Sequence, residues 1–336
     1  MRVAVVGAGS MGGFHAEQLA SLDGVEEVIV VDTDAARADA VAARTGGSRM
    51  GFAEAVEAAD ALIIATPPEL HREQVEAALN AERHALCEKP LTDTLASSIE
   101  LTRRIEAEGA HVEVGFQRRH DAGYLSAREA AGEHLHLVRL TAHDPVLQPG
   151  PDPAGPVPEV APIFRDSSIH DFDLVRWLSG QEVVEVFVEA GNRDGSRPDD
   201  PRQIQKAVVS MRLSGGTLAV LDASWLQPWG YDNRIELISD SAALTGGLSP
   251  RTPLHHADWT PRPADGWQGY LERYAPAYRA ELEAFLLCCR GVRPPAATAR
   301  DGLEAMRIAV AATRSHVERR AVALDEIPGL SRREVA

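Results

Sequence analysis

The fold of this chain is decided near its start by Val3-Ala4-Val5-Val6-Gly7-Ala8-Gly9-Ser10-Met11-Gly12. A short apolar run leads through a glycine-rich turn into a helical pattern, so that N–H groups at the helix start can face the pyrophosphate of a dinucleotide. Gly7 allows the turn, Gly9 lets the backbone approach the phosphates, and Gly12 lets the helix lie close to the strand. Because such turns also occur without a ligand, the surrounding sequence has to support this interpretation.

An acid downstream supplies that support. A second apolar run, residues 28–31, ends at Asp32, whose carboxylate can accept hydrogen bonds from the hydroxyls of an adenosine ribose. A carboxylate there repels a 2′-phosphate, and no arginine follows it directly, so the sequence favours NAD over NADP. Arg37, one helical turn further on, keeps NADP open as the less favoured cofactor.

Length and composition indicate a globular protein with two domains. The chain has 336 residues, of which 44% are hydrophobic and 25% charged, and this excludes a fibre or a disordered chain. The formal net charge of −16 argues against a nucleic-acid or anionic-membrane partner, because both bind basic surfaces. The three cysteines form no CxxC pair, and no apolar stretch suits a signal segment or a membrane span, so we expect a cytoplasmic protein.

The hydrophobic pattern changes along the chain and predicts two kinds of sheet. In residues 1–118, short apolar runs alternate with helical patterns, which is typical of βαβ units in a parallel sheet covered on both faces. These runs are residues 3–6, 28–31, 61–65, 85–87 and 112–114. We therefore expect a doubly wound α/β Rossmann domain, with NAD as its cofactor.

Residues 119–336 follow a different pattern, in which apolar and polar residues alternate. Val184, Val186 and Val188 fall on one face of a strand, and Ile235 and Leu237 alternate with charged residues in the same way. Such alternation is typical of an antiparallel sheet with one open face. The second domain is therefore predicted to be α+β, with an open-faced, mainly antiparallel sheet.

Two stretches carry candidate chemistry. The first, Asp166-Ser167-Ser168-Ile169-His170-Asp171-Phe172-Asp173, follows a proline-rich segment at residues 144–162, which is either a passive loop or the border of an active site. At 100° per residue, one stripe of a helix holds Asp166, His170, Asp173 and Trp177, which places an imidazole one turn from a carboxylate. A helix cap and a satisfied polar histidine explain the same residues, and Asp171 on the packing side stays unexplained.

The second stretch is Cys87-Glu88-Lys89-Pro90-Leu91, which follows an apolar run. It is therefore expected at the carboxyl edge of the parallel sheet, where ligands bind in doubly wound folds. A solvated lysine in a loop is the alternative.

Taken together, the motifs identify a family. Residues 7–12, the triplet Glu88-Lys89-Pro90, residues 114–119 (Val-Gly-Phe-Gln-Arg-Arg) and residues 166–173 occur in the order seen in the Gfo/Idh/MocA oxidoreductases. The chain resembles that family over nearly its whole length, and within it resembles the inositol 2-dehydrogenases most.

The resemblance implies a function, assembly into a homo-oligomer (a dimer or tetramer) through the exposed sheet face of the second domain, and roles for particular residues. It implies NAD lying across the cleft between the two domains, and Lys89, Asp166 and His170 as the catalytic residues, with either His170 or Lys89 as the first proton acceptor. Similarly, Glu88 would approach the nicotinamide ribose, and Pro90 would follow a cis peptide bond. The cofactor-binding residues predicted in this way and from the glycine-rich motif are Gly7, Gly9, Ser10, Met11, Gly12, Asp32, Thr66, Pro67, Glu88 and Lys89.

The expected reaction is the reversible oxidation of a secondary hydroxyl of a cyclic polyol or sugar by NAD. A myo-inositol-type substrate would contact Lys89, Gln117, Asp166, His170 and Tyr231, with Arg119 and His143 as further hydroxyl-binding candidates. Gln117 stands where inositol enzymes commonly have Met, and residues 159–163 (Glu-Val-Ala-Pro-Ile) replace a glycine-bearing stretch. These departures leave the substrate open. An NAD-dependent glycoside hydrolase that oxidises its sugar transiently, and an NAD-binding sensor without activity, are the alternatives.

Overall fold

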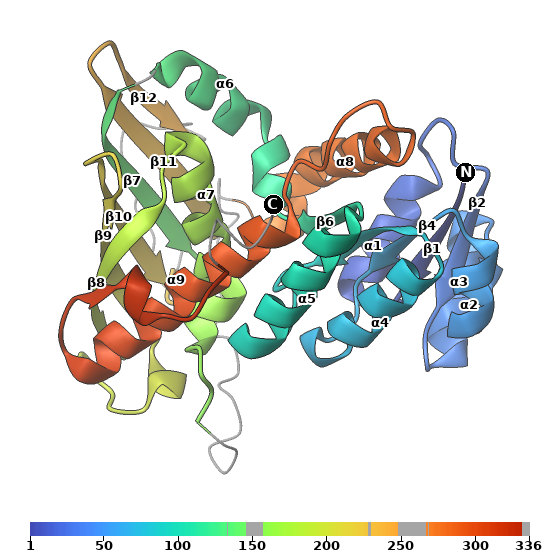
Figure 1. The fold of residues 1–336 in the computed structure, drawn as a ribbon, viewed down its shortest axis with the longest axis horizontal. Coiled ribbons are helices and arrows are strands. Elements are labelled where there is room, and N and C mark those ends of the chain that lie inside the picture. Colours follow the sequence, from blue (N-terminus) through green and yellow to red (C-terminus); the bar gives the residue numbers. More distant parts are fainter. Residues whose placement is uncertain (133, 146–156, 228–229, 248–266, 268, 331–336) are drawn as a thin grey trace. The chain divides into compact units, whose positions relative to one another are not determined.

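The computed structural model describes residues 1–132, 134–145, 157–227, 230–247, 267 and 269–330. Within these residues the chain divides into two compact units (Figure 1). The first comprises Met1–Gln117 and Tyr278–Leu303, with the end of the chain from Gly329, and the second comprises Arg118–Ala277 and Glu304–Pro328. The sequence pattern predicts a single domain boundary, between residues 118 and 119. In the structure, the first unit also contains Tyr278–Leu303, from the second half of the chain. No helix of the described residues is long and apolar enough to cross a membrane.

The first unit contains a six-stranded sheet in the order β3-β2-β1-β4-β5-β6, in which every pair of neighbours is parallel. Its strands are β1 (Arg2–Val6), β2 (Glu27–Val31), β3 (Ser48–Arg49), β4 (Ala61–Ile64), β5 (His84–Glu88) and β6 (Val112–Gly115). The helices between them are α1 (Ser10–Leu19), α2 (Ala35–Thr45), α3 (Phe52–Ala58), α4 (Pro68–Asn80) and α5 (Leu95–Glu108). The Rossmann-like arrangement and all five predicted runs are confirmed. β3 escaped prediction because it has only two residues and no apolar run.

The second unit contains a mixed, mostly antiparallel sheet in the order β12-β11-β7-β10-β9-β8-β13, which confirms the predicted class. Only the pair of β10 and β7 is parallel among its described strands. The strands are β7 (Leu135–His143), β8 (Val183–Gly191), β9 (Lys206–Leu213), β10 (Leu218–Ser224), β11 (Asp232–Ser239), β12 (Ala243–Gly246) and β13 (Val322–Ala323).

The second half of the chain also contains α-helices and short helical turns. They are a 3₁₀ turn η1 (Gln117–His120), α6 (Ala122–Ala131), a π-helical turn η2 (Ile163–Ser168), α7 (Ile169–Ser179), α8 (Tyr270–Cys289), α9 (Ala299–Glu318), and short 3₁₀ turns η3 (Pro201–Gln203) and η4 (Leu324–Glu326). Helix α7 packs against the sheet of the second unit and is buried over nearly its whole length. Helices α8 and α9 each contribute residues to both units.

One face of the second sheet is open, as the alternating pattern predicts. Val186 and Val188 of β8 are fully buried, as are Ile235 and Leu237 of β11. Phe187, Val208 and Leu218 on the other face are 42%, 48% and 46% exposed. The prediction is wrong for Val184, which is 38% exposed, because the pairing register shifts between Val183 and Glu185 and buries Val183 instead.

The glycine-rich turn after β1 requires its glycines for different reasons. Gly7 has a φ of +96°, a conformation that a residue with a Cβ rarely adopts. A Cβ on Gly12 would lie 1.7 Å from the carbonyl oxygen of Gly7, so the start of α1 rests directly on the turn. A Cβ on Gly9 would meet no atom within 4 Å, so the need for glycine at that position does not come from the fold.

These contacts predict opposite stabilities for two alanine variants. We expect Gly12→Ala to lower the free energy of unfolding by about 2 kcal/mol or more, because the backbone oxygen of Gly7 has to move. Gly9→Ala should stay within about 0.5 kcal/mol of the wild type. Urea denaturation of both variants, followed by circular dichroism, measures the difference, and equal stability of the two variants would contradict the close packing described for Gly12.

Candidate active site

The N-terminus of α1 is open to an anion. Its N-cap residue, Gly9, has no capping side chain, and the first turn carries no acidic residue. By contrast, the side chain of Asp34 caps α2 and that of Thr94 caps α5. The N–H groups of the first turn of α1, together with the open space at Gly9, therefore suit the phosphates of a dinucleotide.

Asp32 lies at the end of β2 beside this turn. Its Oδ2 accepts a hydrogen bond from the backbone N–H of Ala8 at 2.7 Å, and its Oδ1 accepts one from Asp34 at 2.8 Å. Each carboxylate oxygen has a second lone pair that can accept a hydrogen bond from a ribose hydroxyl. Arg37 lies 3.7 Å from Oδ2 but also pairs with Asp34 at 3.3 Å.

Two loops at the carboxyl ends of β4 and β5 are joined by a histidine that the sequence did not reveal. His71 on α4 is buried, with Nε2 2.8 Å from the carbonyl oxygen of Thr66 and Nδ1 2.9 Å from that of Pro90. The peptide bond between Lys89 and Pro90 is cis, as the resemblance implied. His71 thereby connects the Thr66–Pro67 loop to the loop that carries Lys89.

Glu88, the last residue of β5, has a buried partner from α1. Its Oε1 lies 2.8 Å from Nε2 of His15, and both side chains are buried. Burial would raise the pKa of Glu88, but the hydrogen bond to His15 and the charges of His15 and Lys89 outweigh this and lower it. Glu88 is therefore a carboxylate at neutral pH, held next to the half-buried Lys89.

In the second unit, Asp166 and His170 lie on two different kinds of helix. Asp166 belongs to the π-helical turn, has a side chain that is 44% exposed and accepts two hydrogen bonds from Arg165, at 2.9 and 3.2 Å. His170 lies in the first turn of α7 and is buried. The spacing of 100° per residue therefore applies from Ile169 onward, and Asp166 lies in a turn of a different helical type.

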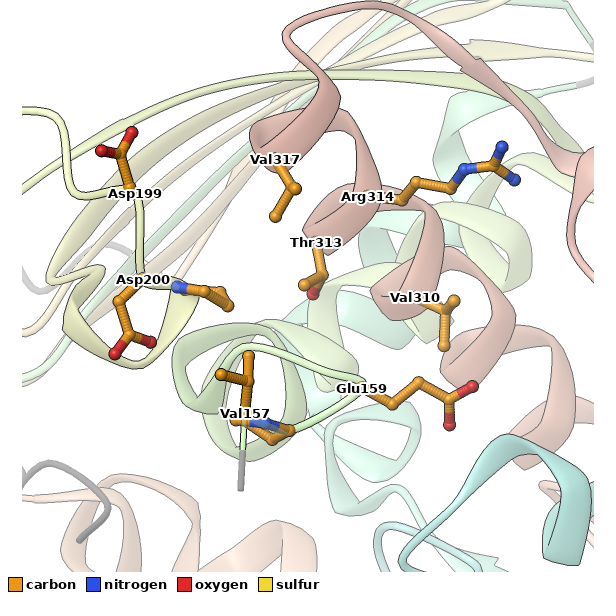
Figure 2. Close-up of a pocket in the computed structure, with 10 residues that line it drawn as sticks. Val157, Glu159, Asp199, Asp200, Val310, Thr313, Arg314 and Val317 are labelled. Carbon is orange, nitrogen blue, oxygen red and sulfur yellow. The ribbon is translucent and has the colours of Figure 1, made fainter. Parts of the chain in front are cut away.

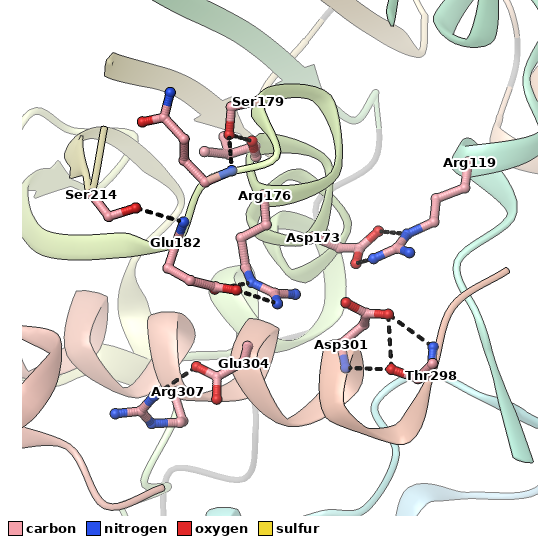
Figure 3. A network of polar contacts seen from close by, with 12 residues as sticks. Arg119, Asp173, Arg176, Ser179, Glu182, Ser214, Thr298, Asp301, Glu304 and Arg307 are labelled. Atoms are coloured by element: carbon pink, nitrogen blue, oxygen red, sulfur yellow. Dashed lines mark hydrogen bonds and ion pairs between the residues drawn. The ribbon is translucent and has the colours of Figure 1, made fainter. Parts of the chain in front are cut away.

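Asp173 does not lie on an exposed face of α7, because its side chain is buried. Arg119 donates two hydrogen bonds to it, from Nε at 2.8 Å and from Nη2 at 2.5 Å (Figure 3). The prediction of a stripe that presents His170 and Asp173 together is wrong for this reason. Arg119, a candidate for binding hydroxyls, is engaged by a carboxylate of its own chain.

Asp171, which the sequence left unexplained, pairs with Arg118. Nη1 of Arg118 donates to its Oδ1 at 2.7 Å, and both residues are buried. Nη2 of the same guanidinium donates to the hydroxyl of Tyr231 at 3.3 Å. Burial raises the pKa of Asp171 to about 6, against the opposing effect of Arg118, so the pair is ionic at pH 7.

The remaining candidates for substrate binding differ in their surroundings. Gln117 is buried, and its Oε1 has no hydrogen-bond partner within the part of the chain that the structure describes. His143 lies 3.1 Å from both Gln227 and Asp222. Of the predicted site residues, the first unit holds the glycine-rich turn, Asp32, Thr66, Pro67, Glu88, Lys89 and Gln117, and the second holds Asp166, His170 and Tyr231.

The second unit also has a pocket of about 540 Å³ (Figure 2). It is lined by valines and prolines, by Thr313 and Arg314, and by the carboxylates of Glu159, Asp199 and Asp200. None of the predicted site residues lines it, so this pocket is not part of the candidate active site. Most of the proline-rich segment, residues 146–156, lies outside the described residues, so its predicted role at an active-site mouth stays a prediction.

Comparison with known proteins identifies two family models along the chain. Residues 1–116 match the Gfo/Idh/MocA model described as an oxidoreductase family with an NAD-binding Rossmann fold. Residues 161–324 match the companion model for the C-terminal alpha/beta domain. The two matches together cover most of the chain.

Individual relatives match over their full length. A myo-inositol dehydrogenase of Streptomyces leeuwenhoekii is 35% identical over 94% of this chain and 97% of its own. A myo-inositol 2-dehydrogenase of Thermotoga maritima is 30% identical over 98% of this chain and 100% of its own. The solved structure of a myo-inositol dehydrogenase from Corynebacterium glutamicum has a TM-score of 0.84 at 26% identity and covers 96% of this chain and 98% of that one.

The buried carboxyl of Asp171 predicts a pH dependence of stability. Because its pKa in the folded protein, about 6, lies above the ordinary 3.8, the folded state binds this proton more tightly than the unfolded state. The stability that this proton contributes is complete below about pH 4 and is lost as the pH rises through about 6. The free energy of unfolding of the wild type should therefore increase relative to that of Asp171→Asn as the pH is lowered from 7 to 4.

Urea denaturation at four pH values measures this difference. Asp199→Asn is the matched control, because the Asp199 side chain is 95% exposed and its difference from the wild type should stay flat. A flat difference for Asp171→Asn, or one of opposite sign, would contradict the pKa assigned to Asp171.

Proposed function

Because the chain belongs to the Gfo/Idh/MocA oxidoreductase family, we propose that it oxidises a secondary hydroxyl group of a cyclic polyol or sugar to the ketone, reversibly and with NAD. The observation that carries this proposal is the full-length match to myo-inositol dehydrogenases in a chain that keeps Lys89, Asp166 and His170. Such a set of cation, acid and imidazole serves alcohol oxidation, and a sensor without activity has no need of it.

The residues of the first unit fit NAD. The uncapped start of α1 would hold the pyrophosphate, and Asp32 would accept hydrogen bonds from the adenosine ribose. We favour NAD over NADP because Asp32 would repel a 2′-phosphate, and Arg37 already pairs with Asp34. When bound, NAD supplies the acceptor for the hydride that leaves the carbinol carbon.

Side chains of the candidate catalytic residues would remove the hydroxyl proton of the substrate. We assign His170 as the general base, because imidazole exchanges a proton near neutral pH, and Asp166 as the acid that orients and stabilises it. Lys89 would donate a hydrogen bond to the alkoxide that develops as the proton leaves. Glu88, kept ionised by His15, would stabilise the positive charge of Lys89 and the orientation of its loop.

A hydroxyl-rich ring is the substrate class that these residues support. Oε1 of the buried Gln117 has no hydrogen-bond partner among the described residues, and it would accept a hydrogen bond from a substrate hydroxyl, because a buried acceptor without a partner is costly. The names of the relatives make myo-inositol the first candidate. A glycosidic substrate whose sugar is oxidised transiently is the second candidate function.

We also propose a cytoplasmic homo-oligomer. The three cysteines are free thiols, as in a reducing compartment. Phe187, Val208 and Leu218 are exposed apolar side chains on the open sheet face, and a second copy could cover them. Sedimentation of the wild type should give a dimer or tetramer, Phe187→Glu should shift it toward a monomer, and a monomeric wild type would contradict the assembly.

An absorbance assay tests the reaction itself. NADH should form on mixing the protein with NAD and a panel of inositols, other cyclitols and pyranoses, and NADP should support a lower rate. Lys89→Ala and His170→Ala should each lower kcat by about 100-fold to 10,000-fold, which is the usual contribution of general acid or base groups. His136→Ala, an exposed histidine paired with Asp240, is the matched control and should leave the rate unchanged.

The same assay separates the alternatives. Release of an aglycone from a glycoside without net formation of NADH would replace the dehydrogenase with the hydrolase. Binding of NAD without turnover on any polyol, sugar or glycoside would favour the sensor and overturn the proposed function.

A further inference from the structure

We propose that Arg118 and Arg119 are positioning residues, which fix the rotation of α7 about its axis and thereby aim His170 at the substrate. The inference rests on the proposed function of His170 as the base. It assigns a purpose to two ion pairs that neither the sequence pattern nor the proposed chemistry explains.

Both pairs join the same two elements. Arg118 and Arg119 are consecutive residues of η1, and their partners, Asp171 and Asp173, lie in α7. All four side chains are buried, so water does not compete with the hydrogen bonds. The connection between η1 and α7 is therefore made by buried charges at two points.

The two points lie on either side of His170. At 100° per residue, Asp171 lies about 100° to one side of the direction of His170, and Asp173 lies about 60° to the other side. A turn of the helix in either sense would stretch one of the two ion pairs. The pairs therefore resist rotation and not merely displacement along the axis.

Each guanidinium is itself held in one orientation. Arg119 donates from two nitrogens to the two oxygens of Asp173, which is a geometry that only the planar fork of arginine provides. Arg118 has Asp171 and the Tyr231 hydroxyl as acceptors, and its Cζ lies 5.6 Å from the centre of the Tyr274 ring. Both guanidinium groups are thus held firmly enough to fix the orientation of α7.

A small rotation is enough to matter. The tip of a side chain lies about 6 Å from the helix axis, so a rotation of roughly 10° moves it by about 1 Å. A misplacement of about 1 Å can cost 100-fold in rate even when the change lies away from the reacting atoms. Losing one anchor should therefore reduce kcat well beyond any loss of folded protein.

Helix α7 offers a matched control at its other end. Arg176 is also buried and also donates through Nε and Nη2, at 2.7 and 3.2 Å, but its partner Glu182 lies only six residues further along the chain (Figure 3). This pair ties the helix end to the segment that follows it and does not anchor α7 to η1. Arg176→Lys therefore removes a comparable pair of hydrogen bonds but leaves both ion pairs between η1 and α7 in place.

The decisive variant is Arg119→Lys, which keeps the buried charge but loses the second hydrogen bond. We expect its kcat, per folded molecule counted by NAD binding, to fall by about 10-fold to 100-fold, with the KM for NAD unchanged. Arg176→Lys should have a similar melting temperature and a kcat within about 2-fold of the wild type. If Arg119→Lys does not fold, the charge-free pair Arg119→Gln with Asp173→Asn is measured in its place.

A second readout separates this inference from the proposed function. The imidazole resonance of His170, assigned with His170→Gln, should shift or broaden in Arg119→Lys and stay in place in Arg176→Lys. An inactive wild type would refute the proposed function, and the resonance would still decide the positioning role. Equal kcat and an unmoved resonance in Arg119→Lys would overturn the inference.

Discussion

Two carboxylates on a buried helix impose the constraint on which the second unit depends. Asp171 and Asp173 are buried there against two guanidinium groups, which offset the cost of placing the carboxyl groups in the interior. Neither arginine can leave without stranding a charge, and such a loss typically costs about 3 to 5 kcal/mol. The segment that follows β6 and the helix that carries His170 are therefore fixed to each other. Local features of α7, such as its missing side-chain cap, matter less because these buried charges hold it in place.

Much of the architecture could be predicted because it depends on the local spacing of apolar residues in the sequence. The continuous apolar runs of the first unit and the alternation at Ile235 and Leu237 both match the structure. The failures have local causes of a different kind. The register shift before Glu185 exposes Val184, and Asp166 lies in a π-helical turn and not in the α-helix that the 100° spacing assumes. Neither irregularity leaves a signal in a hydrophobic pattern, because each depends on backbone pairing in the folded chain.

The polar contacts of the candidate site show a similar limit. Motifs reveal Glu88, Lys89 and Asp32, since each lies at the end of a recognisable strand or directly after it. They do not reveal that His15 holds Glu88 or that His71 joins two loops, since these partners lie 73 and 19 residues away from the groups that they bind. A histidine on a helix looks the same in the sequence whether it fills space or orients a neighbour. Only the folded chain identifies the partners of such residues.

The π-helical turn at Ile163–Ser168 makes the direction of Asp166 depend on the number of residues in that segment. Its i→i+5 hydrogen bonds accommodate one more residue per turn than those of an α-helix. Deletion of a single residue there would turn Asp166 about the helix axis while α7 kept its place. The length of this segment is therefore a variable that can alter the surroundings of His170 without altering the helix that holds it.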